Sequence, residues 1–268
     1  MTAPRQGRDC GKTLGRHPLP VYSGPYRLAV MWSAKAGCTF AIKWFFAQVG
    51  LLEEALGYAR WPHQYRVEVY SRQPGYRESL VDLPELGPRA LKFVRDPHDR
   101  TVSSYLSVCG QINRLTHPPY QRLIADISGY LGRSLGDGDS LTFREFVDYL
   151  EHTYLDRCDV HLRRQVSAAE RRGCLPELTV VQIELSATLL PQLETTFQLK
   201  STDLATLRSS RHHSQRVKVD TIVADRTFLQ TRGVPMPEAA AFYDPDLRAR
   251  VADLYREDLD RYGYVEGR

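Results

Sequence analysis

The sequence of 268 residues contains no apolar run that approaches the roughly 20 residues needed for a helix to cross a bilayer. Its first residues, Met1–Pro20, are rich in Arg, Gly and Pro and lack the apolar core of a secretory signal. We therefore expect a soluble, cytoplasmic protein with no membrane span, in which residues 1–20 form a flexible basic arm.

Cysteine is scarce, and its spacing is irregular. The chain has five cysteines, an odd number, spread widely and without a C-x-x-C pair: Cys10, Cys38, Cys109, Cys158 and Cys174. This spacing fits neither a zinc site nor a disulfide framework. The sequence therefore predicts five reduced, mostly buried thiols.

Lysine is scarce as well, because only six of the 36 basic residues are lysines. The 32 acidic residues leave a net charge of +4, a mild excess that is compatible with an anionic ligand and typical of ordinary surfaces. A module that binds nucleic acid or sulfated glycan would show clustered basic charge with interleaved aromatic residues. Acids are nearly as numerous as bases here, so we keep such a module as a minor alternative and expect no nucleic-acid partner.

Apolar patterning predicts strands that alternate with helices. Expected strands are residues 27–32, 65–70, 89–94 and 178–183. Expected helices are residues 40–52, a short one near 76–83, 97–108, one from 142, 186–197 and 245–262. Residues 111–139 are expected to be irregular, and residues 208–218 form a basic loop. This order favours the α/β class, with one domain over residues 21–268 built on a central parallel sheet flanked by helices.

The first motif, Ser33–Thr39, consists of small residues between the first expected strand and helix. In such a turn, backbone N–H groups converge on an anion, and the helix dipole adds to the attraction. Gly37 allows close approach of the backbone, Thr39 offers a hydroxyl and Lys35 adds a mobile charge. The motif is not a Walker A loop, because the lysine precedes the glycine. An ordinary strand–helix turn remains the alternative for this motif taken alone.

The second motif is Val94–Tyr105, which begins at the end of an expected strand. Arg95 leaves the carboxyl end of that strand, where ligands bind in open α/β sheets. Ser103 follows about two helical turns later on the same side of the next helix. An arginine and a hydroxyl can bind one phosphate by charge-assisted hydrogen bonds. Two phosphate-binding segments predict a nucleotide with phosphates at both ends, although Arg95 could instead pair with Asp96 or Asp99 at the surface.

With these motifs in order, the chain resembles the sulfotransferases that use 3′-phosphoadenosine-5′-phosphosulfate (PAPS), in particular the carbohydrate branch. The family loop P-K-x-G-[ST]-[ST] is matched at Lys35, Gly37 and Thr39, whereas Ala34 and Cys38 depart from it. The family motif [VI]-R-[DE]-P-x-x-R-x-x-S-x-Y is matched throughout by residues 94–105. Three further segments resemble that branch: 141–146, 159–165 and 254–264.

The resemblance implies a P-loop-like sulfotransferase domain over residues 21–268 and assigns roles by position. Lys35, Ala36, Gly37, Cys38 and Thr39 would hold the 5′-phosphate, with Lys35 near the bridging oxygen. Arg95 and Ser103 would hold the 3′-phosphate, and Arg100 would brace the loop. The basic segment Arg211–Arg216 would close over the nucleotide, which places Arg216 among the binding residues.

The implied reaction moves a sulfonate group from PAPS to an acceptor hydroxyl and releases adenosine 3′,5′-bisphosphate. Lys35 would stabilise the leaving phosphate, and no metal is expected because the nucleotide is held by cations and backbone dipoles. The acceptor hydroxyl needs a general base. His63 is the first candidate, because relatives place a histidine or glutamate between the two motifs. Glu68 and His161 are the alternatives, and each of the three could instead be structural.

The acceptor and the oligomeric state are not readable from the sequence. A sugar hydroxyl is expected from the branch resemblance, with small molecules or lipid glycoconjugates as alternatives. Residues 111–139 and 200–240 are the expected acceptor-facing insertions. The competing enzyme class is a P-loop-type kinase, which should show G-K-[ST] and a carboxylate for magnesium at a strand end.

Overall fold

The computed structural model describes residues 10–14, 19–112, 118–136, 138–208, 215–231 and 233–264. The chain divides into two compact units, which are described separately. The first contains residues 1–95 and 165–209, and the second contains residues 96–164 and 210–268. The α/β class expected from the sequence is confirmed.

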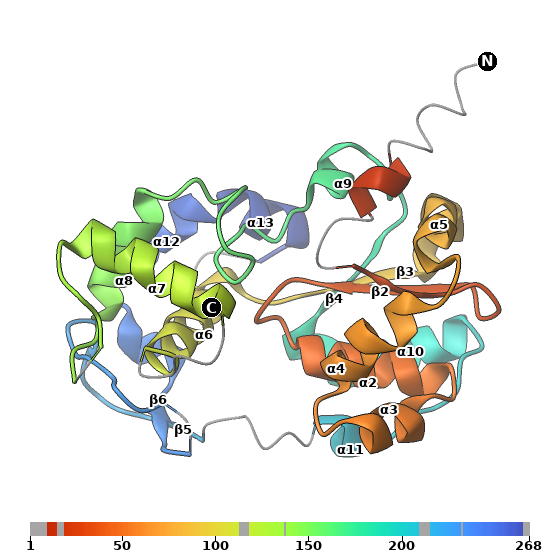
Figure 1. Cartoon of the computed structure of the whole chain (residues 1–268), viewed down its shortest axis with the longest axis horizontal. Coiled ribbons are helices and arrows are strands. Elements are labelled where there is room, and N and C mark those ends of the chain that lie inside the picture. Colours follow the sequence, from red (N-terminus) through yellow and green to blue (C-terminus); the bar gives the residue numbers. More distant parts are fainter. Residues whose placement is uncertain are drawn as a thin grey trace. The chain divides into compact units, whose positions relative to one another are not determined.

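The first unit is built on a four-stranded sheet (Figure 1). Its strands follow the chain order: β1 (Val21–Ser23), β2 (Leu28–Trp32), β3 (Ala90–Val94) and β4 (Thr179–Gln182). β2, β3 and β4 are parallel, and β1 adds an antiparallel edge. Because Trp32 pairs with Phe93, the carboxyl ends of β2 and β3 lie side by side. The predicted parallel sheet is therefore correct, and it places the segments after β2 and β3 at one edge.

Helices cover both faces of this sheet. Their bounds are α2 (Cys38–Gln48), α3 (Leu52–Tyr58), α4 (Pro62–Glu68), α5 (Tyr76–Ser79), α9 (Ala168–Arg171), α10 (Ser186–Thr196) and α11 (Leu204–Arg208), with 3₁₀ helices at Tyr70–Arg72, Leu80–Arg89 and Ile183–Leu185. Side chains alternate along β3, so Phe93 meets Trp44 of α2 while Lys92 forms a buried ion pair with Glu170 of α9. Figure 1 shows α2 and α9 on opposite sides of the strands.

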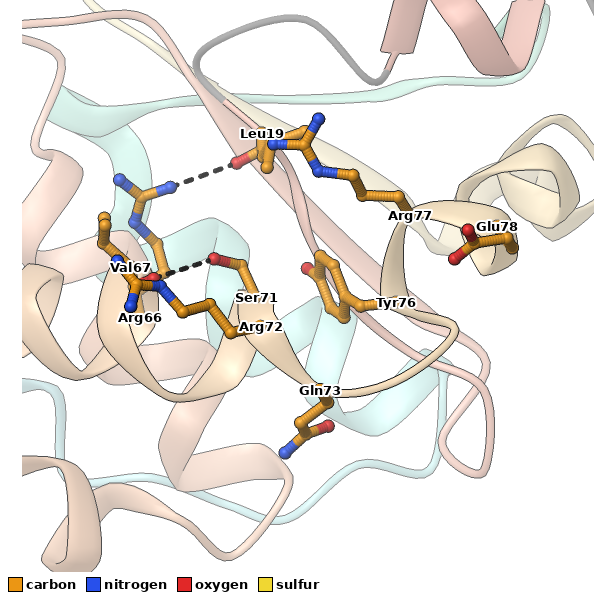
Figure 2. A pocket seen from close by; sticks show the side chains of 9 residues that line it. All are labelled: Leu19, Arg66, Val67, Ser71, Arg72, Gln73, Tyr76, Arg77 and Glu78. Atoms are coloured by element: carbon orange, nitrogen blue, oxygen red, sulfur yellow. Dashed lines mark hydrogen bonds between the residues drawn. The ribbon is translucent and has the colours of Figure 1, made fainter.

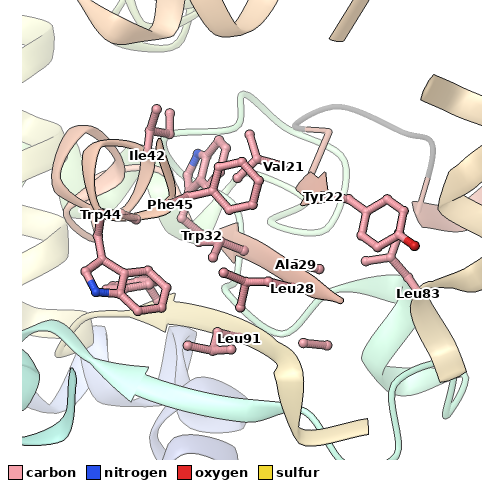
Figure 3. Packing of buried hydrophobic residues seen from close by; sticks show 14 of the residues in the cluster. Val21, Tyr22, Leu28, Ala29, Trp32, Ile42, Trp44, Phe45, Leu83 and Leu91 are labelled. Atoms are coloured by element: carbon pink, nitrogen blue, oxygen red, sulfur yellow. The ribbon is translucent and has the colours of Figure 1, made fainter. Parts of the chain in front are cut away.

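The core of the first unit is aromatic. Trp44, Phe45 and Phe46 of α2 are fully buried, and Figure 3 shows Trp44 and Phe45 projecting towards the strands. The indole N–H of Trp44 donates to Glu194 of α10 (2.7 Å), so the polar atom of this ring is satisfied. The same carboxylate accepts from Gln48 (3.1 Å), which joins α2 to α10 at the carboxyl end of α2.

The strand expected at residues 65–70 is wrong, because residues 62–68 form α4. Pro62 occupies the first helical position, where its missing N–H costs nothing. Tyr65 packs edge-on against Phe46 (5.3 Å between ring centroids), and Tyr70 packs against Phe45 (5.7 Å). These contacts with α2 favour the helix, although the local alternation of residue types favours a strand.

The second unit is mainly helical. Its elements are α6 (Pro97–Cys109), α7 (Pro118–Leu131), α8 (Phe143–Glu151), α12 (Pro245–Leu254), α13 (Arg256–Tyr262), a 3₁₀ helix (Ala239–Phe242) and a parallel pair, β5 (Arg216–Val217) with β6 (Met236–Pro237). The predicted caps are confirmed: Asp96 accepts from two N–H groups of α6, and Thr142 forms a capping box with Glu145. Tyr105 is fully buried and packs against Phe143 (5.4 Å between ring centroids).

The irregular structure expected for residues 111–139 is wrong for α7. The prolines at its start stand in the first turn, where helices tolerate them. Tyr120, Leu123 and Ile127 recur at helical spacing and are buried in the core of the second unit. The helix expected over residues 245–262 is present but divided at Tyr255 into α12 and α13.

The prediction of five reduced thiols is also wrong. Cys10 and Cys174 form a disulfide (Cα–Cα 5.5 Å), whereas Cys38, Cys109 and Cys158 are free. Residues 10–14 are helical, and Leu14 is buried, so these five residues differ from the flexible arm expected over 1–20. The rest of that arm up to Pro18 lies outside the described residues. Spacing in the sequence could not show the bridge because its cysteines are 164 residues apart.

Candidate functional site

A tight loop of small residues joins β2 to α2, where the sequence predicts an anion-binding turn. The loop runs through Ser33–Gly37, and α2 begins at Cys38. The N–H of Ala36 donates to the carbonyl of Ser33 (3.1 Å), and the N–H of Ser33 donates to the carbonyl of Phe93 on β3 (3.2 Å). The loop is thus held by hydrogen bonds within itself and to the neighbouring strand.

Gly37 is the N-cap residue of α2 and has φ 76°. A glycine has no side chain with which to cap the first N–H groups of the helix, so these donors and the helix dipole suit an anion. A Cβ at this position would lie 2.7 Å from Cδ1 of Ile183, so the position also excludes larger residues. Lys35 shares the positive φ, at 68°, which makes the turn tight.

Cys38 departs from the hydroxyl-bearing residue of the family pattern. Burial raises the pKa of the Cys38 thiol, and the charge of Lys35 offsets only part of that rise. The thiol donates to the carbonyl of Ser33 (3.4 Å). Cys38 is therefore neutral at physiological pH, and its sulfur does not repel an anion at the start of α2.

Arg95 lies at the end of β3, and the side chain of Gln165 fixes its backbone. The N–H of Arg95 donates to Oε1 of Gln165 (3.0 Å), and Nε2 of Gln165 donates to the carbonyl of Arg95 (2.8 Å). Gln165 is 2% exposed, and its own carbonyl accepts a hydrogen bond from the buried ammonium of Lys92. Both amide atoms of Gln165 therefore serve to position Arg95.

The guanidinium of Arg95 reaches the loop after β2. Its Nη1 donates to the carbonyl of Lys35 (3.5 Å). Lys35 and Arg95 each follow the carboxyl end of one of two adjacent parallel strands, as the sequence predicts. The first unit thus brings the guanidinium of Arg95 to the loop that carries Lys35 and precedes the N-terminus of α2, an arrangement that suits a phosphorylated ligand.

The rest of the second motif belongs to the second unit. Ser103 stands in the second turn of α6 and is half-buried. Arg100 is 1% exposed, its guanidinium donates to the carbonyl of His161 (3.4 Å), and it lies over the ring of Tyr255 (5.8 Å). Ser104 donates to the same carbonyl (2.7 Å). Arg100 thus contacts residues of the second unit, and the bracing of the loop that the resemblance implies for it stays a prediction.

His161 is half-buried in the second unit. Its Nδ1 lies 2.7 Å from Oδ1 of Asp159, and its ring stacks on Tyr120 (4.8 Å between centroids). Hydrogen bonds from the histidine hold the pKa of Asp159 below its usual value despite the burial of that carboxyl. A carboxylate at Nδ1 fixes the orientation of the imidazole.

His63, the first candidate for the base, lies in the first turn of α4. Its ring lies tilted against that of Trp61 (4.6 Å between centroids) and forms an edge contact with Trp32, the last residue of β2 (6.1 Å). Burial and the charge of Arg66 lower the pKa of His63 to about 3. The imidazole is therefore neutral at physiological pH and a weak base in the absence of ligand. It lies next to the strand that leads into the loop.

Glu68, an alternative base, has exposed partners. It accepts from the hydroxyl of Tyr58 (2.8 Å) and from Nε2 of Gln64 (3.3 Å). His63 and Glu68 are five residues apart on one helix, so they project about 140° apart. The structure therefore does not bring Glu68 to the environment of His63.

Arg216 begins β5 and is exposed, with Nη1 donating to the carbonyl of Pro237 (2.9 Å). The segment 211–214, predicted to close over the nucleotide, lies outside the described residues. The role predicted for Arg216 in nucleotide binding stays a prediction.

Two residues in the first unit were missed as parts of the site. Gln165 closes the segment 159–165, whose resemblance to the carbohydrate branch was the available signal. Arg66 was missed because its segment was predicted to be a strand. Its guanidinium lies over the ring of Trp32 (5.3 Å), and its charge acts on both His63 and Cys38.

Comparisons with known proteins give one match. A family model described as "Sulfotransferase family" matches residues 58–265, which is most of the chain and includes Arg95 and Ser103 but not the loop of Lys35. No match was found among curated proteins or among solved structures. Within the described residues, no cluster of three His, Cys, Asp or Glu could hold a metal ion. No helix in the same part of the chain is long and apolar enough to span a membrane.

Proposed function

This chain belongs to the sulfotransferase family, and we propose that it moves a sulfonate group from PAPS to an acceptor hydroxyl, releasing adenosine 3′,5′-bisphosphate. The observation that carries the proposal is the hydrogen bond from the guanidinium of Arg95 to the carbonyl of Lys35. It joins the two predicted phosphate-binding segments within one rigidly hydrogen-bonded edge of the sheet. A donor with phosphates at both ends of a nucleoside has the charges that suit these segments.

The residues of the loop fit the 5′-phosphosulfate of this donor. Gly37 leaves the first N–H groups of α2 without a side-chain cap, and Lys35 supplies a cation beside them. Cys38 stays neutral, so the loop carries no negative charge of its own. Arg95 and Ser103 are proposed to hold the 3′-phosphate, as a guanidinium and a hydroxyl can.

PAPS, when bound, would supply the sulfonate group: its sulfur would bond to the acceptor oxygen, the bond to the bridging oxygen would break, and adenosine 3′,5′-bisphosphate would leave. Lys35 and the N-terminus of α2 stabilise the negative charge that grows on the leaving oxygen. Gln165 holds the backbone of Arg95 in place, so that little reorganisation is needed when the donor binds. The residues that bind the donor are cations and backbone dipoles, and we propose that no metal takes part.

We propose His63 as the general base for the acceptor hydroxyl. Its neutral imidazole can take up the proton, and its contacts with Trp61 and Trp32 fix the ring. A pKa of about 3 makes it a weak base in the absence of ligand. A negatively charged donor close by would raise that pKa towards neutrality, because an opposite charge favours the imidazolium.

A sugar hydroxyl is the proposed acceptor, on the resemblance to the carbohydrate branch. Chimeras that exchange residues 111–139 or 200–240 test whether these segments select the acceptor. An unchanged acceptor preference in both chimeras would contradict that role.

Calorimetric titration with adenosine 3′,5′-bisphosphate, AMP and ATP with magnesium tests the donor. We expect tight binding of the bisphosphate, weak binding of the other two, and a loss of about tenfold or more in Arg95→Ala. Arg89→Ala is the matched control, because Arg89 stands just before the other end of β3 and donates to the carbonyls of Tyr26 and Phe197. Preference for ATP with magnesium, or equal effects of the two variants, would contradict the proposal and favour a kinase.

A further inference from the structure

A cavity lies in the first unit, formed by residues other than those of Ser33–Gly37, the loop proposed to bind the donor and called the donor loop below. Its volume is about 490 Å³, within the range of small-molecule pockets. Leu19, α4, the 3₁₀ helix after it and α5 form its walls (Figure 2). Neither Lys35 nor Arg95 lines it.

The charge of this pocket is strongly positive. Arg66, Arg72 and Arg77 line it, against a single acidic residue, Glu78. Within the described part of the chain, none of the three guanidinium groups forms an ion pair with a carboxylate. Figure 2 shows Glu78 beyond Tyr76 and Arg77, on the side opposite Arg66 and Arg72. The pocket therefore presents three cations that the described residues do not neutralise.

Arg66 is the unusual member of this set because it is buried. It is only 6% exposed, and Nη1 donates to the carbonyl of Leu19 (3.5 Å), the contact drawn in Figure 2. Its Nε is buried and has no hydrogen-bond acceptor among the described residues. Burial lowers the pKa of Arg66, which reflects the cost of holding this charge away from water. A buried guanidinium with an unsatisfied donor is costly unless an anion accompanies it.

We propose that this pocket binds an oxyanion group, a carboxylate, sulfate or phosphate, with the buried Arg66 on its inner wall and Arg72 and Arg77 on its exposed side. Guanidinium groups bind these anions through paired N–H donors. The anion can be free in solution or can be an acidic group on the acceptor. The second source rests on the proposed function. It is supported by the contact of Arg66 with Trp32, the residue before the donor loop.

Titration of the full chain with sodium sulfate, against sodium chloride at equal ionic strength, tests the pocket. We use Arg72→Gln/Arg77→Gln, since both residues are exposed and the fold should tolerate the change. Arg60→Gln/Arg122→Gln is the matched control, which removes two exposed arginines elsewhere. We expect sulfate affinity to fall about tenfold or more in the pocket variant and to stay unchanged in the control. Equal sulfate affinity in the two folded variants would overturn the proposal.

The donor loop could also bind sulfate, so the titration is repeated on Arg95→Gln. The pocket predicts a sulfate-binding event that survives Arg95→Gln and is lost in the pocket variant. Bisphosphate binding should be weakened in Arg95→Gln and unchanged in Arg72→Gln/Arg77→Gln. A failure of bisphosphate to bind would contradict the proposed function and leave the sulfate result for the pocket intact. Loss of all sulfate binding in Arg95→Gln would overturn the pocket.

The two sources of the anion are separated with glucose 6-sulfate and glucose as probes. Tighter binding of glucose 6-sulfate than of inorganic sulfate, lost in the pocket variant, assigns the pocket to an acidic group carried on a sugar. Equal affinities for the two sulfates, with none for glucose, assign it to a free anion. Binding of glucose as tight as that of its sulfate would overturn the requirement for an oxyanion.

Discussion

The positioning of Arg95 by Gln165 leads to a prediction that separates stability from nucleotide binding. Gln165→Met keeps the approximate size of the side chain and removes both of its hydrogen bonds to the backbone of Arg95, at 3.0 and 2.8 Å. Each partner left unsatisfied in a partly buried place costs about 1–2 kcal/mol. The free energy of unfolding should therefore fall by about 2–4 kcal/mol.

The same substitution should weaken the binding of adenosine 3′,5′-bisphosphate. Freed from Gln165, the backbone of Arg95 no longer holds the guanidinium near the carbonyl of Lys35, and ordering it on binding costs free energy. We expect the dissociation constant measured by calorimetry to rise about tenfold, equivalent to about 1.4 kcal/mol.

Gln48→Met is the matched control. Gln48 is 4% exposed in the first unit and also makes hydrogen bonds through both amide atoms, to Glu194 and to the backbone of Lys200. It lies at the end of α2 that is remote from the loop. The Gln48→Met variant should lose a similar amount of free energy of unfolding in chemical denaturation and keep its affinity for the bisphosphate. Equal affinities in the two variants would refute the positioning role of Gln165.

Three other predictions follow from single contacts. Gly37→Ala should weaken bisphosphate binding, and the left-handed backbone alone should lower the free energy of unfolding by about 1–2 kcal/mol. In a double-mutant cycle, Ile183→Ala should restore only the stability lost to the clash with the new Cβ. Full recovery of stability would show that φ does not matter. Burial keeps the pKa of His63 at about 3, below its unfolded value near 6.5, so the unfolded chain binds the extra proton between these pH values. The free energy of unfolding should therefore fall as the pH is lowered from about 6.5 to about 3, by up to about 1.4 kcal/mol per pH unit more than in His63→Asn. Parallel pH profiles of the two proteins would count against this. Replacing Cys10 and Cys174 by serine removes a cross-link between residues 164 apart in the sequence. Disulfides typically stabilise a fold by about 2–4 kcal/mol, so the melting temperature should fall while the bisphosphate affinity stays unchanged.

The parts of the fold that sequence predicts best are those determined locally. The caps at Asp96 and Thr142 are chemical signals for a helix start, and both are present. β2 and β3 are short apolar runs with the burial expected of central strands. Because the carboxyl ends of parallel strands meet at one edge, the proximity of Lys35 and Arg95 also follows from order along the chain.

The parts that sequence does not predict depend on contacts between distant segments. The disulfide of Cys10 needs a partner 164 residues away, and no spacing rule covers that distance. Gln165 acts on Arg95 across 70 residues. The resemblance of residues 159–165 to the carbohydrate branch marks this segment, but a glutamine has no chemical signature for such a role, so the structure is needed to identify its contact with Arg95.

The incorrect strand at residues 65–70 and the pocket have the same cause. In a strand, side chains alternate, so Arg66 would share a face with Glu68 and stand opposite Tyr65. That placement predicts a solvated arginine next to a carboxylate, with its charge paired. In α4, Arg66 is instead buried beside Trp32, and Glu68 is exposed and bonded to Tyr58. Aromatic packing against α2 favours the helix over the strand, and the helix separates Arg66 from the carboxylate of Glu68. Arg66 is therefore buried without a carboxylate, and the pocket can bind an anion beside it.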